Sequence, residues 1–202
     1  DNMTAAALIV AAGRGERLGG PVAKQYQSLA GIPVLRHALL AFCHHPGINA
    51  VAAVIRGEDR ALYDQAAEGL NLLPPILGGD NRQQSVLHGL QGLESLNPDK
   101  ILIHDGARPF ISAPVIDNVL AGLAAHDGAV AAVPVVDSLK RGDAGRIVAE
   151  VRRDDLWRAQ TPQGFDFAAL LAAHGSADAG HTDDASLARA AGLDVALVAG
   201  AE

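Results

Sequence analysis

Short apolar segments alternate with longer stretches of helical periodicity along the chain. Residues 5–12 are continuously apolar and end at Gly13, which is typical of a parallel strand buried on both faces. Further short apolar segments occupy residues 51–55, 101–104 and 130–136. Helical stretches cover 33–44 and 59–69, a segment with Val86, Leu90 and Leu93 on one face, and residues from Ser112 onward. This order predicts an α/β fold, a doubly wound and mostly parallel Rossmann-like sheet with right-handed crossovers.

The alternation changes between Asp137 and Asp155. A turn cluster at residues 142–145, Gly-Asp-Ala-Gly, separates two short segments at 137–141 and 146–151. This arrangement predicts a projecting β-hairpin. Such an arm buries little against its own domain and often packs on a partner subunit. We therefore expect residues 1–202 to form a single domain, with 137–155 as its arm.

Charge and composition exclude several classes of protein. The chain has 16 Lys and Arg against 23 Asp and Glu, and only 3% aromatic residues, which argues against a dedicated nucleic-acid binder. A single cysteine excludes a disulfide scaffold or a zinc finger, and the histidines are too scattered to form a ligand set. Four polar residues followed by about eight apolar ones make neither a signal peptide nor a membrane span, so a cytoplasmic location is expected.

The first polar cluster after a predicted strand is rich in glycine. Ligands of open α/β sheets bind beyond the carboxyl ends of the strands. The loop after residue 12 carries several glycines together with Arg17 and Lys24, which favours phosphate binding over the alternative of a tight turn with solvated arginines. Leu18 stands where a dinucleotide fingerprint requires glycine, and the P-loop pair Gly-Lys does not occur in the sequence.

Two further clusters each leave a structural alternative open. Asp105 ends a strand and precedes Arg108, so its carboxylate could bind Mg²⁺ with substrate phosphates or could cap a turn. The side chain of His104 should point to the opposite face of the sheet. Residues 78–85 could recognise a base or ribose, or simply begin a helix at Asp80 or Asn81.

The last cluster is spread over three segments. It comprises Arg152-Arg153, the Ala-Gln-Thr-Pro-Gln segment at 159–163, and Thr182-Asp183-Asp184. In the third segment, a Thr182 cap followed by aspartates in the first helical turn explains the pattern without a ligand. A functional interpretation of this cluster depends on the other motifs.

Seven motifs in order resemble the 2-C-methyl-D-erythritol 4-phosphate cytidylyltransferase family over about residues 6–200. They are Ala-Ala-Gly-x-Gly-x-Arg-Leu with Pro-x-x-Lys-Gln-Tyr at 21–26, the Gly-Gly-Asp stretch, His-Asp-x-Ala-Arg-Pro, Asp-Ser-Leu-Lys-Arg at 137–141, Leu-Trp-Arg-Ala-Gln-Thr-Pro-Gln and Thr-Asp-Asp-Ala-Ser. The first motif marks many nucleotidyltransferases, whereas the ordered set is specific. The resemblance implies a nucleotidyltransferase sheet and transfer of a cytidylyl group from CTP to methylerythritol phosphate in non-mevalonate isoprenoid biosynthesis.

The resemblance also implies roles for individual residues. The residues carried over as catalytic are Arg17, Lys24 and Arg153. Those carried over for the nucleotide are Ala11, Ala12, Gly13, Gly15, Gly79, Asp80 and Ser85. Those carried over for the acceptor are Asp105, Arg108, Ser138, Arg153 and Thr161. Asp105 is also the expected ligand of Mg²⁺ or another divalent cation, and the arm is expected to complete a site shared in a homodimer.

Two departures from the family pattern stand out. Ser138 occupies an arm position that is often Thr, which keeps the hydroxyl. The sequence given ends at Glu202, where the family continues with a segment containing Asn-x-Lys-x-Thr, so we expect the C-terminal family elements to be absent. Some members are fused downstream to 2-C-methyl-D-erythritol 2,4-cyclodiphosphate synthase, which makes a fused or associated synthase an expected partner.

Three alternative functions remain open at this point. The nearest is a cytidylyltransferase for another polyol phosphate such as ribitol 5-phosphate, which the Asp-Ser-Leu-Lys-Arg and Leu-Trp-Arg-Ala segments disfavour. The second is a non-catalytic nucleotide-binding or assembly module, which retention of Arg17, Lys24 and Asp105 disfavours. The third is a dinucleotide oxidoreductase, which Leu18 disfavours.

Overall fold

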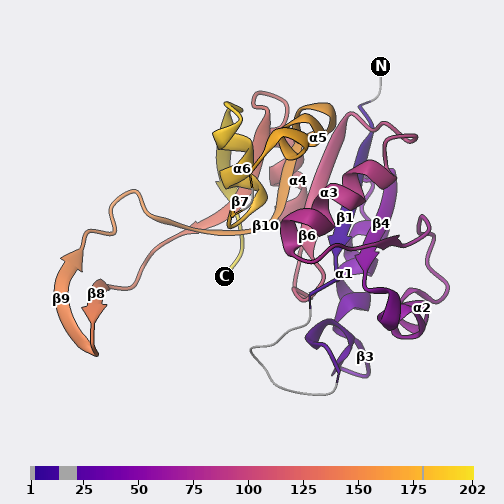
Figure 1. The fold of residues 1–202 in the computed structure, drawn as a ribbon, viewed down its shortest axis with the longest axis horizontal. Helices are drawn as coiled ribbons and strands as arrows, with labels where there is room; N and C mark the ends of the chain where they lie inside the picture. The colour runs from indigo at the N-terminus through magenta and orange to yellow at the C-terminus, as the bar shows by residue number, and fades with distance from the viewer. Residues whose placement is uncertain (1–2, 14–21, 179) are drawn as a thin grey trace.

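A central seven-stranded sheet with helices on both faces organises the chain (Figure 1). The computed structural model describes residues 3–13, 22–178 and 180–202. The strands lie in the order β11-β7-β10-β6-β1-β4-β5. Their bounds are Ala5–Val10 for β1, Ala50–Ile55 for β4, Ile76–Leu77 for β5, Lys100–Asp105 for β6, Gly128–Pro134 for β7, Trp157–Asp166 for β10 and Val195–Ala199 for β11. The strands predicted from the apolar segments are confirmed.

The parallel register places the ends of neighbouring strands together. Strand β1 pairs in parallel with both β4 and β6, and Val10 lies opposite Val54 on one side and Asp105 on the other. Strand β11 pairs in parallel with β7. Because β1 is flanked on both edges and covered on both faces, its residues Ala5–Ile9 are buried, as a continuous apolar segment predicts.

Strand β10 is the exception to the parallel arrangement. It lies between β6 and β7 and runs antiparallel to both, with an irregularity in its pairing with β7 between Ala159 and Gln163. This segment was predicted to carry motifs but no strand. The sheet is therefore mixed and mostly parallel, and β10 carries the chain from the arm into the centre of the sheet.

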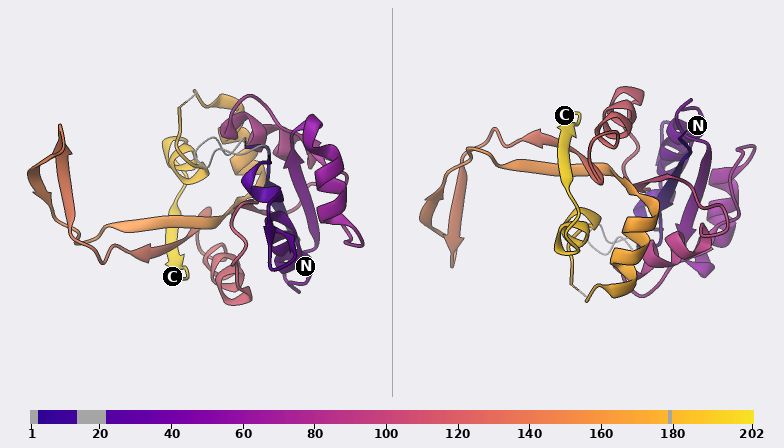
Figure 2. Two further views of the ribbon diagram at one scale, coloured as in Figure 1. Left: turned by 90° about the horizontal axis from the view of Figure 1, so that it is seen from below. Right: turned by 90° about the horizontal axis from the view of Figure 1, so that it is seen from above.

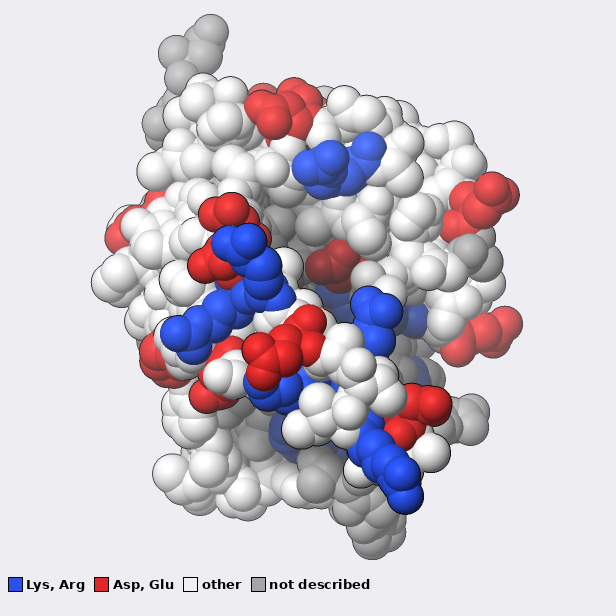
Figure 3. All heavy atoms as spheres, turned by 90° about the vertical axis from the view of Figure 1, so that its left-hand side faces the viewer, with Lys and Arg blue, Asp and Glu red and all other residues white. Residues whose placement is uncertain are grey.

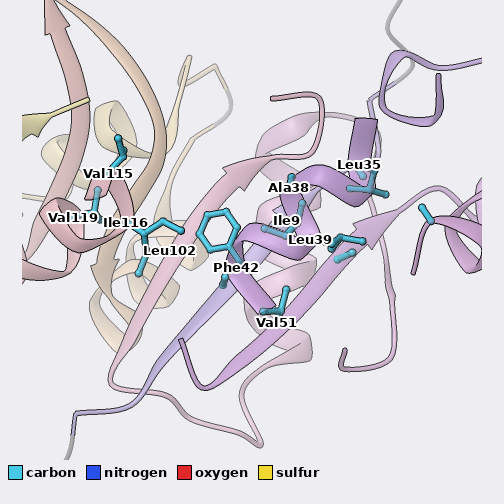
Figure 4. Close-up of a cluster of buried hydrophobic side chains, with 14 of the residues drawn as sticks. Ile9, Leu35, Ala38, Leu39, Phe42, Val51, Leu102, Val115, Ile116 and Val119 are labelled. Carbon is cyan, nitrogen blue, oxygen red and sulfur yellow. The ribbon is translucent and has the colours of Figure 1, made fainter. Parts of the chain in front are cut away.

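Two apolar cores fill the spaces between the sheet and its helices. One face is covered by α1 (Val34–Cys43), α2 (Arg60–Ala67) and α4 (Ala113–Gly122), and the other by α3 (Arg82–Gly92), α5 (Phe167–Ser176) and α6 (Asp184–Ala190). In the first core, Leu35, Leu39 and Phe42 recur at helical spacing and turn one face of α1 onto the sheet. Figure 4 shows the ring of Phe42 beside Leu102 of β6. Complete burial of such a side chain contributes about 1.5–3 kcal/mol.

Side-chain caps fix where two functional helices begin. Asn81 caps α3 by accepting a hydrogen bond from the backbone N–H of Gln84 at 2.9 Å, which settles the choice between Asp80 and Asn81. The cap of α6 is Asp183, which forms a capping box with Ser186. The prediction of a Thr182 cap was wrong by one residue, because the Asp183 carboxylate reaches the third backbone N–H of the helix.

The predicted arm is confirmed as an antiparallel hairpin. Strands β8 (Leu139–Asp143) and β9 (Arg146–Val151) pair only with each other among the described strands and extend away from the central sheet (Figures 1 and 2). The turn uses Ala144 and Gly145, both at positive φ. Ile147 and Val148 are 69% and 56% exposed on the arm.

Three short pieces complete the fold. They are the hairpin of β2 (Ser28–Leu29) with β3 (Ile32–Pro33), and the 3₁₀ turns η2 (Lys24–Tyr26) and η3 (Gly57–Asp59). Turn η2 follows the glycine-rich loop and contacts α1 and α2. Among the described residues, no helix combines the length and the apolar character that a membrane crossing requires.

Candidate active site

The first residues of the loops that follow β1, β5 and β6 lie together at the edge of the sheet where β1, β4 and β6 end. The backbone N–H of Ala11 donates to the carbonyl oxygen of Val54 at 2.8 Å, and that of Gly106 donates to Val10 at 2.8 Å. The N–H of Gly78 donates to Ile55 at 2.9 Å. These bonds hold the loops after β1, β5 and β6 side by side at the edge where open α/β sheets bind ligands.

The buried amide of Gln25 fixes the start of the glycine-rich loop. Its Nε2 donates to the carbonyl oxygens of Ala11 at 2.8 Å and Gly13 at 2.9 Å. Gln25 is 4% exposed, whereas Lys24 beside it in η2 is exposed at the surface. The predicted residues Gly15 and Arg17 lie outside the described residues. Sequence reasoning gave Gln25 no role, although the Lys-Gln-Tyr motif contained it.

The segment before α3 packs tightly against this loop. A Cβ added at Gly78 would lie 2.6 Å from the Cβ of Ala12 and 2.8 Å from the Oγ of Ser85, so the two loops are in van der Waals contact. The Ser85 hydroxyl accepts from the N–H of Gly79 at 3.1 Å and donates to the Asn81 carbonyl at 2.9 Å.

The structure thus places the described members of the predicted nucleotide set around one small region, namely Ala11, Ala12, Gly13, Gly79, Asp80 and Ser85. Asp80 lies at its exposed rim, where its N–H donates to Gln84 Oε1 at 2.9 Å. Backbone groups and small side chains make up this region, as the close approach of Gly78 to Ala12 and Ser85 shows.

Two arginines hold the carboxylate of Asp105. Arg82 Nε lies 3.3 Å from Oδ1, and Arg108 Nε lies 3.1 Å from Oδ2. The Asp105 side chain is 31% exposed at the end of β6, so it stays accessible to a ligand. Arg108 was predicted, whereas Arg82 lies within the 78–85 segment and was given no role of its own.

His104 faces the opposite side of the sheet, as predicted. Its ring centroid lies 5.0 Å from that of Phe42. His104 Nε2 donates to the Arg108 carbonyl at 3.0 Å, and Nδ1 lies 3.0 Å from the Thr161 hydroxyl, which accepts from the N–H of Asp105 at 3.3 Å. Because the carbonyl only accepts, Nε2 carries the hydrogen and Nδ1 accepts from Thr161. Burial lowers the pKa of His104 to about 4.

Thr161 therefore forms hydrogen bonds inside the protein, beneath the site. It is 8% exposed, and its hydroxyl is engaged by His104 and the Asp105 backbone. Its predicted contact with the acceptor stays a prediction. Thr161 lies next to Asp105 and accepts a hydrogen bond from its backbone N–H.

A buried carboxylate lies behind Arg82. Asp184 Oδ2 accepts from Arg82 Nη1 at 2.8 Å, and Oδ1 accepts from His174 Nε2 at 3.2 Å. Burial would raise the pKa of Asp184, but His174 and Arg82 outweigh it and lower the pKa. Burial would likewise lower the pKa of Arg82, yet Asp184 and Asp105 raise it. Asp184 was predicted only as a first-turn residue of α6.

The arm carries its predicted residues away from the edge just described. Ser138 and Arg153 are exposed, and a guanidinium nitrogen of Arg153 donates to the carbonyl of Val136 at the base of the arm. Figure 3 looks onto the side of the molecule that bears the arm and shows Lys and Arg interspersed with Asp and Glu. Within one chain, these two residues are not gathered with Asp105.

The residues at the site could bind Mg²⁺ only together with ligands from a substrate. Among the described residues, no three or more His, Cys, Asp or Glu side chains are grouped to hold a metal ion. Mg²⁺ in phosphate-transfer sites is bound by one or two carboxylates together with substrate phosphates. The accessible carboxylate of Asp105 matches that requirement, with phosphates and water as the remaining ligands.

Comparisons with known proteins identify the family of the chain. A family model described as 2-C-methyl-D-erythritol 4-phosphate cytidylyltransferase (IspD) matches residues 5–202. The bifunctional enzyme IspD/IspF of Paramagnetospirillum magneticum is 57% identical over 196 residues, which make up 96% of this chain and 51% of that enzyme. The chain thus spans about half the length of the bifunctional relatives that it matches. The 2-C-methyl-D-erythritol 4-phosphate cytidylyltransferase of Cereibacter sphaeroides is 48% identical over 203 residues, 99% of this chain and 89% of that protein.

Solved structures of the same family have a similar fold. The crystal structure of 2-C-methyl-D-erythritol 4-phosphate cytidylyltransferase from Thermus thermophilus has a TM-score of 0.82 at 31% identity and covers 98% of this chain and 90% of its own. The bifunctional IspDF of Campylobacter jejuni has a TM-score of 0.81 at 21% identity, covering 98% of this chain and 50% of its own, which is a likeness of fold. The predicted fold class is confirmed.

Proposed function

Because the chain belongs to the 2-C-methyl-D-erythritol 4-phosphate cytidylyltransferase (IspD) family, we propose that it transfers a cytidylyl group from CTP to 2-C-methyl-D-erythritol 4-phosphate. Pyrophosphate is the second product, and the reaction belongs to non-mevalonate isoprenoid biosynthesis in the cytoplasm. The observation that supports this proposal most strongly is that Ala11 and Ala12 at the start of the glycine-rich loop, the segment before α3 and Asp105 lie together at one edge of the sheet.

The reaction requires positioning and charge stabilisation. The acceptor phosphate attacks the α-phosphorus of CTP, and the bond from that phosphorus to pyrophosphate breaks, so negative charge develops on two anions held close together. We assign Lys24, together with Arg17 from outside the described residues, to that charge. Gly79, Ser85 and the backbone at Ala11 and Ala12 are assigned to the nucleoside, and the backbone donors of Gly13 and Gly15 to the phosphates.

Asp105 is assigned to Mg²⁺ and Arg108 to the acceptor. Bound Mg²⁺ would neutralise charge on the substrate phosphates. Because Ser138 and Arg153 project on the arm, we propose a homodimer in which the arm reaches the site of a second copy, where Arg153 and Ser138 contact the acceptor phosphate beside Thr161. The exposed Ile147 and Val148 on the arm support such an interface.

Two experiments test the reaction. Pyrophosphate release is measured with CTP, Mg²⁺ and either methylerythritol phosphate or ribitol 5-phosphate, and turnover with ribitol 5-phosphate alone would overturn the choice of acceptor. Removal of Mg²⁺ by a chelator should abolish turnover. No release with either acceptor would favour a nucleotide-binding module.

Substitution of Lys24 tests the charge assignment. Lys24→Ala should lower turnover about a hundredfold with the fold intact. The matched control is Lys100→Ala, at the start of β6 and the far end of that strand from Asp105, which should change turnover less than about twofold. Equal turnover in wild type and Lys24→Ala would remove Lys24 from the mechanism.

Association and fusion are separate proposals. Sedimentation of the chain should give a dimer that Ile147→Asp on the arm weakens, since the substitution buries a charge at the proposed interface. The bifunctional relatives also support a fused or associated 2-C-methyl-D-erythritol 2,4-cyclodiphosphate synthase as a partner.

A further inference from the structure

We propose that Asp184 is a positioning residue that orients Asp105 through Arg82. The effect of this positioning on turnover rests on the proposed cytidylyl transfer. The three side chains come from different elements, because Arg82 opens α3, Asp105 ends β6 and Asp184 opens α6. The guanidinium lies between the two carboxylates and bridges them.

Geometry makes Asp184 the anchor of this bridge. Arg82 Nη1 lies 2.8 Å from Asp184 Oδ2, whereas its Nε lies 3.3 Å from Asp105 Oδ1. The Asp184 side chain is 1% exposed, compared with 31% for Asp105. The shorter, buried pair therefore fixes the guanidinium plane, and the longer pair points one nitrogen of that plane at the site.

His174 holds the anchor in its turn. Its Nε2 donates to Asp184 Oδ1 at 3.2 Å, and its side chain is also 1% exposed at the end of α5. Both oxygens of Asp184 are thus used, so the carboxylate cannot rotate away without leaving a buried partner unpaired. The low pKa of Asp184 keeps it ionised at neutral pH.

As a result, the carboxylate of Asp105 is held in one orientation. Arg82 restrains one oxygen of Asp105, and Arg108, whose side chain is 52% exposed, restrains the other. When a ligand displaces Arg108 from Asp105, the buried pair keeps Arg82 in place. Asp105 then meets its ligand in a fixed rotamer, and a positive charge remains beside the substrate phosphates.

Asp184→Asn is the central test, because it keeps the shape and removes the charge. The variant should lower kcat/KM for the acceptor by about tenfold to a hundredfold, as for other residues that orient a ligand side chain. The KM for CTP should change less than about twofold. The matched control is Asp194→Asn, in a surface pair with His126 at 2.7 Å between β7 and β11, which should leave both parameters unchanged.

A double-mutant cycle separates positioning from general destabilisation. If Asp184 acts through Asp105, then Asp184→Asn should have little further effect on kcat/KM in an Asp105→Asn background. Arg82→Lys should reproduce the Asp184→Asn defect, because one ammonium cannot bridge two carboxylates as the planar guanidinium does. Multiplicative effects of the Asp184 and Asp105 substitutions would overturn the proposal.

The positioning role of Asp184 can also be tested without measuring turnover, and so independently of the proposed function. The ¹⁵Nε–H resonance of Arg82 should be slow to exchange in the wild-type protein and fast in Asp184→Asn. Unchanged exchange would overturn the positioning role even if the enzyme were active. Absence of cytidylyl transfer in the wild type, with the exchange difference present, would instead refute the proposed function and retain the bridge.

Discussion

The hydroxyl of Thr161 donates a hydrogen bond to Nδ1 of His104 across 3.0 Å of buried space. This contact joins β10 to β6 directly beneath the carboxylate of Asp105. The same hydroxyl accepts from the N–H of Asp105, so a single oxygen sets the position of the strand end. The site is therefore supported from the opposite face of the sheet by two residues that stay out of the solvent.

Thr161→Val should destabilise the protein by about 1–3 kcal/mol, because it leaves His104 Nδ1 and the Asp105 N–H without partners. Thr161→Ser keeps the hydroxyl and should recover most of the loss. Urea unfolding of the ligand-free protein measures both values. A Thr161→Val protein of wild-type stability that had lost only acceptor binding would place the hydroxyl on the substrate instead.

The free energy of unfolding should decrease as the pH is lowered, because burial keeps His104 neutral in the folded protein. Burial lowers its pKa to about 4, whereas the imidazole of the unfolded chain titrates near 6.5. Between pH 6.5 and 4, His104 is protonated in the unfolded chain but stays neutral in the folded protein. The free energy of unfolding therefore declines over this range, by up to about 3 kcal/mol.

Urea unfolding at several pH values measures this decline. His104→Gln removes the titrating group and should flatten the slope in that window relative to wild type. An identical slope in the variant would assign the acid sensitivity to other groups.

Gln25→Ala should weaken the hold on the glycine-rich loop. It removes the donor to the carbonyls of Ala11 and Gly13, the residues that lead into the glycine-rich segment. We expect kcat/KM for CTP to fall by up to about a hundredfold, since small displacements of positioning groups have large effects. Gln27→Ala is the matched control, because among the described residues its exposed amide donates only to the Val22 carbonyl, at 3.2 Å. Equal kinetics for the two variants would contradict the role of Gln25.

Gly78→Ala should separate the two loops that we assign to the nucleoside. The added methyl would lie 2.6 Å from the Cβ of Ala12 and 2.8 Å from Ser85 Oγ, with little room to relax. Overpacking of this kind costs about 1–3 kcal/mol. Gly57→Ala meets only Leu77, at 3.9 Å, and should be tolerated. Equilibrium CTP binding and thermal unfolding compare the pair, and normal CTP binding by Gly78→Ala would show that the close contact is dispensable.

Several parts of the fold could be predicted because local signals and the final packing agree. The apolar segment at 5–12 is buried on both sides, as a strand in the middle of a sheet must be. The hairpin arm was predicted from the Gly-Asp-Ala-Gly turn and the two short segments beside it, since its pairing is local. The placement of Asp105 at a strand end followed from the same alternation and needed no tertiary information.

Other features depend on contacts that no local pattern encodes. Strand β10 has a polar, proline-containing sequence without a clear period, and it is a strand because β6 and β7 pair with both of its edges. Arg82 and Asp184 are 102 positions apart, so nothing in the sequence pairs them. The only available signal was a charged residue at the start of each of two helices that lead into the site.

The reversed direction of β10 has a consequence for assembly on the ribosome. Strands β1, β4, β5 and β6 can associate as soon as they are made, but β7 joins them only through β10. Until residue 166 has emerged, β6 presents an unpaired edge, and β7 has no neighbour in the sheet. The nascent chain therefore holds half a sheet open for about sixty residues of synthesis, and chaperones that shield such an edge would act in that interval.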